Sequence, residues 1–295
     1  MGFLQHLLVN IVLTTPLVGA YTMFALGIVF IYRGSRVLNL AHGAMAMVPA
    51  YVALDLSHHI GAVPAVVLAV GLGGLIGAGV ERGVVRRLRT AGATAQTVGT
   101  VGVLGLMIAM ADRVWGTTPR RGVDVFPEHG FHVGNSVLHL GDIGLFVSAL
   151  VLAGAFLALF QLTDLGLAMR CAADNRRAAT LMGIDPDRTT AVAWFFAGGL
   201  AGLGGVLLGA STNLHPHILS LQVLPAFVAA LLGGLESLPG AVVGSIVVGV
   251  TVGIVPSFGG IGHEIGAPEL ALTLLAFLVM SMRGKRFSVA DAGAA

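Results

Sequence analysis

The sequence predicts an all-α fold: a single polytopic transmembrane helix bundle of about eight to nine spans over residues 1–295, with one short helix outside the membrane. Hydrophobic residues make up 56% of the chain and charged residues only 10%, whereas a soluble domain has about 25% charged residues. Apolar segments of about 20 residues, long enough to cross a bilayer, recur along the chain. The 43 glycines are typical of helices that pack closely inside lipid. This composition excludes an ordinary soluble enzyme, a disordered chain and a disulfide scaffold, and the net charge of +2 gives no indication of nucleic-acid binding.

Nine segments have the length and hydropathy expected of a membrane span. They are residues 8–32, 38–57, 61–80, 95–112, 143–161, 190–210, 220–235, 239–256 and 268–282. Segments 38–57 and 220–235 are short or interrupted by proline and glycine, so one of them could be broken or re-entrant, and eight crossings are the alternative. No Lys or Arg precedes Arg33, so the first segment lacks the positive region of a cleaved signal peptide and is expected to be a membrane helix.

The cations predict how the spans are oriented. With nine crossings, thirteen of the sixteen Lys and Arg residues fall on one side. These are Arg33, Arg36, Arg82, Arg86, Arg87, Arg89, Arg170, Arg176, Arg177, Arg188, Arg283, Lys285 and Arg286. Cytoplasmic loops carry the excess of cations. We therefore expect the N-terminus outside and the C-terminus in the cytoplasm.

Polar residues at the start of the second predicted span are candidates for a functional role. Asn39 and His42 are three residues apart, a spacing that would place them on one helix face, and Gly43 follows directly. Polar groups in lipid are costly and usually face the bundle interior. Lining of a transport pathway, or a gate hinge, is one interpretation. An interhelical hydrogen bond that locks the fold is an equally weighted alternative.

The start of the fourth predicted span carries a second group of neutral polar residues. Gln96, Thr97 and Thr100 lie beside small residues, and neutral hydrogen-bonding groups would suit a zwitterionic or amide substrate. The alternative, favoured for Thr97, is that a threonine hydroxyl bonds to the backbone of its own helix.

The loop over residues 162–189 predicts a short helix between two spans. Asp174 or Asn175 can cap its N-terminus, residues 176–182 favour a helix, and Gly183 suits the left-handed position after it. Asp185 followed by proline then predicts the start of the next span. A basic helix of this kind is interpreted as a docking element for a soluble partner. A helix lying on lipid headgroups is the alternative.

No motif of an enzyme, a cofactor site or a metal site is present. The only Gly-Lys pair, at residues 284–285, lacks the glycine-rich loop of an ATPase. The single cysteine, Cys171, excludes a multi-cysteine metal site, and the histidines lie in separate loops rather than converging. No carboxylate is expected in mid-membrane, which argues against an ion-coupled carrier. We therefore expect a non-catalytic membrane protein driven by an energy source outside this chain.

Four segments resemble the permease subunits of branched-chain amino acid ABC importers. They are GAYTMFALGIVFIYRGSRVLNLAHGAMAMVPAY at 19–51, TVGTVG at 97–102, TDLGLAMRCAADNRRAATLMGID at 163–185 with FFAGGLAGLGGVLLG at 195–209, and LPAFVAALLGGLESLPGAVVGSIVVG at 224–249. They are spread over residues 19–249, most of the length of the chain, in the order expected of the family. The chain departs from the family at Leu40, where phenylalanine is usual, and at Glu236, where glycine is usual.

The resemblance implies a subunit of an ATP-driven importer in the bacterial plasma membrane. In such an importer two permease chains, here expected to be similar but distinct, form the pathway by alternating access. Two cytoplasmic ATP-binding subunits hydrolyse ATP, and a periplasmic or lipid-anchored binding protein delivers branched-chain or other hydrophobic amino acids. Urea, short amides or other small carboxylates are alternative substrates, and a stand-alone channel or facilitator is the alternative of another class.

The resemblance also implies that the short helix is the coupling helix, which contacts an ATP-binding subunit. Its expected residues are Arg170, Asp174, Asn175, Arg176, Arg177, Ala178, Leu181, Met182 and Gly183.

Overall fold

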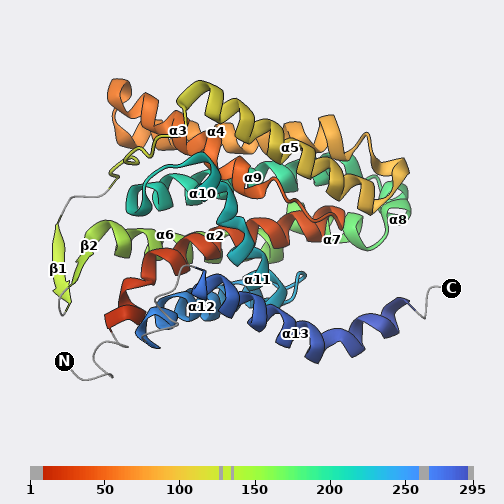
Figure 1. The fold of residues 1–295 in the computed structure, drawn as a ribbon. Coiled ribbons are helices and arrows are strands. Elements are labelled where there is room, and N and C mark those ends of the chain that lie inside the picture. The colour runs from red at the N-terminus through yellow and green to blue at the C-terminus, as the bar shows by residue number, and fades with distance from the viewer. Residues whose placement is uncertain (1–8, 126–128, 134–135, 259–265, 292–295) are drawn as a thin grey trace.

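A computed structural model describes residues 9–125, 129–133, 136–258 and 266–291, and it shows a bundle of helices (Figure 1). Its long helices are α2 (Thr15–Ser35), α3 (His42–Ile60), α4 (Ala62–Val80), α5 (Ala93–Trp115), α6 (Leu140–Leu162), α9 (Pro186–Thr212), α12 (Leu238–Ile254) and α13 (Ala267–Asp291). Its shorter helices are α7 (Asp164–Asp174), α8 (Arg176–Leu181), α10 (Pro216–Leu221) and α11 (Val223–Gly233). A π-helical turn, Glu81–Val85, continues α4, and two 3-10 turns lie at Arg89–Ala91 and Val255–Phe258.

The predicted all-α bundle is confirmed, with one small addition. Strands β1 (Gly130–Val133) and β2 (Ser136–His139) form an antiparallel hairpin before α6. Figure 1 shows this hairpin at one end of the bundle and α8 at the other.

Each of the nine predicted segments contains helix, with shifted boundaries. Among the described residues, seven helices are long and apolar enough to cross a membrane. They are Thr15–Ser35, Ala62–Val85, Ala93–Trp115, Leu140–Leu162, Pro186–Thr212, Pro216–Gly233 and Leu238–Phe258. α3 does not reach this standard, and the apolar part of α13, Ala267–Ser281, is shorter. The start of the first predicted segment, residue 8, lies outside the described residues.

The expected interruption in segment 220–235 is confirmed as a break at Gln222, between α10 and α11. Pro225 follows the break, and a proline has no N–H to donate to the carbonyl one turn earlier. A residue of α2 contacts this break: the Tyr21 hydroxyl donates a hydrogen bond to the Gln222 side-chain oxygen at 3.2 Å.

The core lies around α2 and α9, which are enclosed by the other helices, whereas α5 is mostly exposed. α4 packs against α9 through glycines. A Cβ atom on Gly77 would lie 2.1 Å from the carbonyl oxygen of Trp194, and one on Gly73 would lie 2.5 Å from that of Gly198. Such close backbone approach is possible only where neither side chain intervenes, as in many membrane helix pairs. The recurring small residues therefore fix the α4–α9 contact.

Candidate functional site

The predicted residues at the start of α3 come together, but in a different geometry from the one expected. Asn39 lies in the turn before α3, where its side-chain oxygen accepts a hydrogen bond from the Ala41 N–H at 3.1 Å. The prediction that Asn39 and His42 share a helix face is therefore wrong, because this turn delays the helix until His42. Both residues are nevertheless buried.

His42, the first residue of α3, lies fully buried against α2. Its ring packs edge-on against Phe24, with 6.3 Å between the ring centroids. A Cβ atom on Gly27 would lie 2.5 Å from the His42 Nε2 atom, so the glycine makes room for the ring. Within the described part of the chain, neither ring nitrogen has a hydrogen-bond partner of ordinary geometry, and the backbone of Phe24 is the nearby acceptor. Because this polar ring is enclosed, a shift of α2 or of α3 would change the groups around it.

Gly43 brings α3 against the broken helix. A Cβ atom there would lie 2.1 Å from the carbonyl oxygen of Ser220, in the last turn of α10. Ser220 is buried, and the break at Gln222 follows two residues later. The start of α3 therefore contacts the most irregular part of the helix pair α10–α11.

Thr100 ties α5 to the same turn. Its Oγ1 atom accepts a hydrogen bond from the Leu40 N–H at 3.0 Å and donates to the Thr97 carbonyl at 2.7 Å. Gln96 lies one turn away, buried, and donates to the Val85 carbonyl at 2.9 Å. The side chain of Thr97 has no hydrogen-bond partner among the described residues. Gln96 and Thr100 thus hold two segments against α5. Thr100 also makes the bond to its own helix backbone that is the alternative for a threonine, whereas Thr97, for which that alternative is favoured, makes no such bond among the described residues.

We name this cluster the α3 lock: Tyr21, Asn39, His42, Gly43, Thr100, Ser220 and Gln222. Its members come from α2, the turn before α3, the start of α3, α5, and α10 with the break that follows it. Sequence reasoning missed Tyr21, Ser220 and Gln222. The only available signal was the proline-interrupted segment, which indicated a break without indicating its partners. Hydrogen bonds of Tyr21, Asn39 and Thr100, and the backbone contact at Gly43, hold these elements together.

Replacing Thr100 by valine is expected to destabilise the chain by about 1–3 kcal/mol, because the Leu40 N–H then loses its acceptor while the side-chain shape is kept. The melting temperature in detergent measures the effect. Thr97→Val is the matched control on the same helix and should leave the melting temperature nearly unchanged. Equal melting temperatures for the two variants would show that the Leu40 bond contributes nothing.

The short helix α8 forms where the sequence predicts it. The side-chain oxygen of Asn175 accepts a hydrogen bond from the Ala178 N–H at 2.9 Å, so Asn175 rather than Asp174 is the cap. Gly183 has a φ of +82°. The N–H of Gly183 bonds to the Thr180 carbonyl and that of Ile184 to the Ala179 carbonyl, both at 3.0 Å. This pair of bonds is a Schellman motif, which ends the helix sharply.

Arg170 and Asp174 do not belong to α8, which corrects their inclusion in the coupling helix. Both lie on α7, which ends at Asp174 because Asn175 has extended backbone. α8 itself covers Arg176–Leu181, with Met182 at its C-terminal cap. Its outer surface is apolar at the tip, where Leu181 is 86% exposed and Met182 64% exposed. These two side chains give α8 a small exposed apolar surface beside its arginines.

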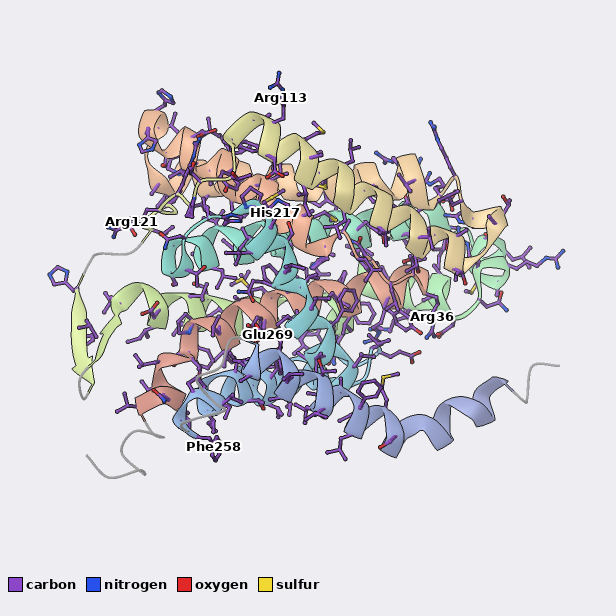
Figure 2. The ribbon with its side chains drawn as sticks, in the orientation of Figure 1. Arg36, Arg113, Arg121, His217, Phe258 and Glu269 are labelled. Atoms are coloured by element: carbon purple, nitrogen blue, oxygen red, sulfur yellow. The ribbon has the colours of Figure 1, made fainter. Side chains whose placement is uncertain are left out.

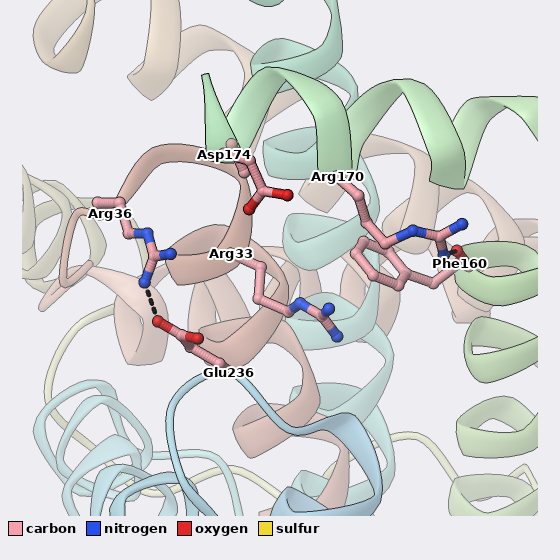
Figure 3. Close-up of a pocket in the computed structure, with 7 residues that line it drawn as sticks. Arg33, Arg36, Phe160, Arg170, Asp174 and Glu236 are labelled. Carbon is pink, nitrogen blue, oxygen red and sulfur yellow. Dashed lines mark hydrogen bonds and ion pairs between the residues drawn. The ribbon is translucent and has the colours of Figure 1, made fainter. Parts of the chain in front are cut away.

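Arg170 instead contributes to a pocket of about 80 Å³ beside α2 (Figure 3). The pocket is lined by Arg33, Arg36, Phe160, Arg170, Ala173, Asp174 and Glu236. The guanidinium of Arg33 lies 4.2 Å and that of Arg170 5.3 Å from the centre of the Phe160 ring. Arg36 forms an ion pair with Glu236, which the dashed line in Figure 3 marks. We name this part of the bundle, with α8, the arginine end.

The opposite end carries a different set of polar contacts. His217 Nε2 lies 3.1 Å from an Asp112 carboxylate oxygen, and the indole N–H of Trp115 donates to Asp55 at 2.7 Å. Tyr51 stacks on Trp115 with 5.0 Å between ring centroids. Figure 2 shows His217 and Arg121 away from Arg36, toward this end. Part of the loop that connects α5 to α6 lies outside the described residues.

Comparison with known proteins gives a consistent result. The family model for the permease component of branched-chain amino acid transport systems matches residues 10–282. The probable branched-chain amino acid transport permease protein LivH of Methanocaldococcus jannaschii is 28% identical over 247 residues, which cover 79% of this chain and 76% of that protein.

Two bacterial relatives match at similar identity. The high-affinity branched-chain amino acid transport system permease protein LivH of Escherichia coli is 27% identical over 303 residues, covering 94% of each chain. The corresponding protein BraD of Pseudomonas aeruginosa is 27% identical over 264 residues, covering 84% of this chain and 85% of that one. Among solved structures, PsaBC from Streptococcus pneumoniae in complex with Fab matches with a TM-score of 0.44 at 16% identity, over 95% of this chain and 91% of that chain. With apolar helices long enough to span a membrane and a family match over nearly its whole length, the chain is a multi-pass membrane protein that belongs to the family of permease components of branched-chain amino acid transport systems.

Proposed function

We propose that this chain forms half of the translocation pathway of an ATP-driven importer for branched-chain or other hydrophobic amino acids. The other half is a second, homologous permease chain. Two ATP-binding subunits bind at the arginine end, and a periplasmic or lipid-anchored binding protein delivers substrate at the opposite end. The arginine end, with the C-terminus, then faces the cytoplasm and the N-terminus faces outward.

The observation that carries this proposal is α8. A helix of six residues is too short to be stable alone, yet this one has a side-chain cap, a Schellman motif and an exposed apolar tip. Such a helix is positioned by its neighbours for contact with something outside the chain. The capped residues 175–183 lie beside α7, α9 and the arginine contacts, and a soluble ATP-binding subunit is the partner that the family membership favours.

The α3 lock is the proposed gate. Asn39, His42, Gly43 and Thr100 join α2, α3, α5 and the broken helix α10–α11, so a shift of any one helix must break buried contacts in the others. Broken helices in transporters commonly line the substrate route. Gln96 and Thr97 lie on the same helix as Thr100, and Gln96 supports the π-helical turn at the end of α4 rather than facing an open route. The bonds that Gln96 and Thr100 make within the protein remove the main reason for preferring urea or an amide as substrate.

The test is purification of the tagged chain from its native cells in mild detergent, followed by mass spectrometry and uptake of radiolabelled leucine in proteoliposomes. Recovery of two ATP-binding subunits and a second permease, with leucine uptake that requires ATP and is not reduced by excess urea, is the expected result. Uptake by this chain alone without ATP would support a facilitator and refute the proposal. Uptake that urea abolishes would keep the assembly and change the substrate.

A further inference from the structure

A chain of ion pairs connects α8 with the end of α4 across about a hundred residues of sequence. Asp187, in the first turn of α9, is its centre. One carboxylate oxygen of Asp187 accepts a hydrogen bond from Arg89 at 2.7 Å and another from Arg176 of α8. The backbone carbonyl of Asp187 accepts a hydrogen bond from Arg86 at 3.0 Å. One residue of α9 thus contacts three arginines from two other segments.

The buried Glu81 side chain binds two of these arginines, Arg86 and Arg89. Its side chain is completely buried at the end of α4, and it accepts hydrogen bonds from Arg86 at 3.1 and 2.8 Å, one at each carboxylate oxygen. Arg89 approaches the same carboxylate at 3.7 Å. These hydrogen bonds raise the pKa of Arg86 above its ordinary value. A buried carboxylate is retained only where such partners satisfy it, so Arg86 and Arg89 are held in one position.

The ion pair between Arg176 and Asp187 restricts the position of α8 relative to α9. The C-terminal end of α8 is joined to α9 covalently, through the short turn after Gly183. Its N-terminal end is joined to α7 through Asn175, and Arg176 at that end also pairs with Asp187, so α8 is tied directly to the first turn of α9. With both ends held, α8 cannot rotate relative to the first turn of α9, and α4 is bound to the same carboxylate.

α4 and α9, which these arginines connect to α8, are closely packed against each other. Gly77 and Gly73 of α4 contact the backbone of α9. Further along α9, a Cβ atom on Gly205 would lie 2.3 Å from the Ala46 carbonyl oxygen in α3. Closely packed interiors transmit displacement instead of absorbing it. A displacement of α8 therefore moves α9 and α4, and through them the start of α3.

We infer that Asp187 and Glu81 are positioning residues for energy coupling: their contacts with Arg86, Arg89 and Arg176 make α8, α4 and α9 move as one body when the ATP-binding subunits displace α8. This inference rests on the proposed function, since it names the route by which that displacement reaches the α3 lock. It assigns no contact with substrate to either residue.

The first experiment compares Asp187→Asn and Arg176→Gln with wild type in the complete importer in proteoliposomes. Asp187→Asn removes the negative charge of this ion pair while keeping the side-chain size, and Arg176→Gln removes its positive charge and shortens the side chain. ATP hydrolysed per leucine imported is expected to rise at least about fivefold, the lower end of the coupling usually found between linked sites. Arg188→Gln is the matched control, because Arg188 lies in the same turn of α9 and its one ion-pair partner among the described residues is the neighbouring Asp185, at 3.2 Å. Its ratio should equal that of wild type.

The second experiment measures the connection directly and does not depend on the substrate. In a Cys171→Ser background, spin labels at Ala178 of α8 and Gly79 of α4, both exposed, report the distance between these helices. We expect a narrow distribution in wild type and Arg188→Gln, and a broad one in Asp187→Asn and Arg176→Gln. Unchanged width and unchanged coupling ratio in the two variants would overturn the inference. If the wild-type chain binds no ATP-binding subunit, the proposed function fails, and the distance measurement still decides whether Asp187 holds α8.

Discussion

Replacing Gly77 by alanine is expected to lower the melting temperature of the chain in detergent by about 4–8 °C, which corresponds to a loss of about 2 kcal/mol in a protein of this size. The added Cβ atom would lie 2.1 Å from the Trp194 carbonyl oxygen, and both atoms belong to helix backbones. No side chain can move aside, so α4 must separate from α9. Thermal unfolding followed by tryptophan fluorescence measures the change, because Trp194 is fully buried at this contact.

Gly79→Ala is the control for this experiment. Gly79 lies two residues along the same helix, and a Cβ atom there would meet no atom within 4 Å. Alanine favours a helix over glycine by up to about 1 kcal/mol, so this variant should be as stable as wild type or more so. If both variants melt at the same temperature, the α4–α9 glycine contact does not stabilise the bundle, and the rigid connection from α8 to α3 loses its support.

The contrast between Gly77 and Gly79 also shows what the sequence could not predict. Hydropathy indicated the positions of all nine helical segments, because each requires only a run of apolar residues. It could not distinguish the two glycines, since their difference depends on how α4 is rotated against a helix more than a hundred residues away. The same limit applies to Arg170, which the resemblance places in the coupling helix but which lies on α7 and packs against Phe160.

The capping residues predict the local structure better than the charged residues do. Asn175, Gly183 and Asp185 act in the structure as their spacing predicts, because a cap is decided within four residues of sequence. Asn39 also bonds to a near neighbour in the sequence. Its side chain accepts a hydrogen bond from the Ala41 N–H and forms a turn at a position where the sequence predicts the start of a helix. Glu81 gave no signal at all. A single carboxylate at the end of an apolar run looks like the edge of a span, and only the fold places Asp187 against the arginines that bind Glu81.

Replacing Gly183 by valine is expected to uncouple the importer. Gly183 has a φ of +82°, and a β-branched residue in this left-handed region is destabilised by about 1–2 kcal/mol. Relief of that strain requires loss of the two hydrogen bonds that end α8, which changes the angle between α8 and α9. Leucine imported per ATP hydrolysed should fall by about fivefold or more, the population change that such an energy produces. Uptake and ATP hydrolysis in the same proteoliposomes give this ratio.

Gly183→Asn separates conformation from contact. Asparagine adopts the left-handed region readily, and a Cβ atom at this position would meet no atom within 4 Å of the chain itself. If coupling needs only the backbone conformation, asparagine should preserve it while valine abolishes it. If both variants uncouple transport, the bare surface of Gly183 must itself contact the ATP-binding subunit. If neither does, the angle of α8 does not matter for coupling, and the assignment of α8 as the coupling helix is wrong.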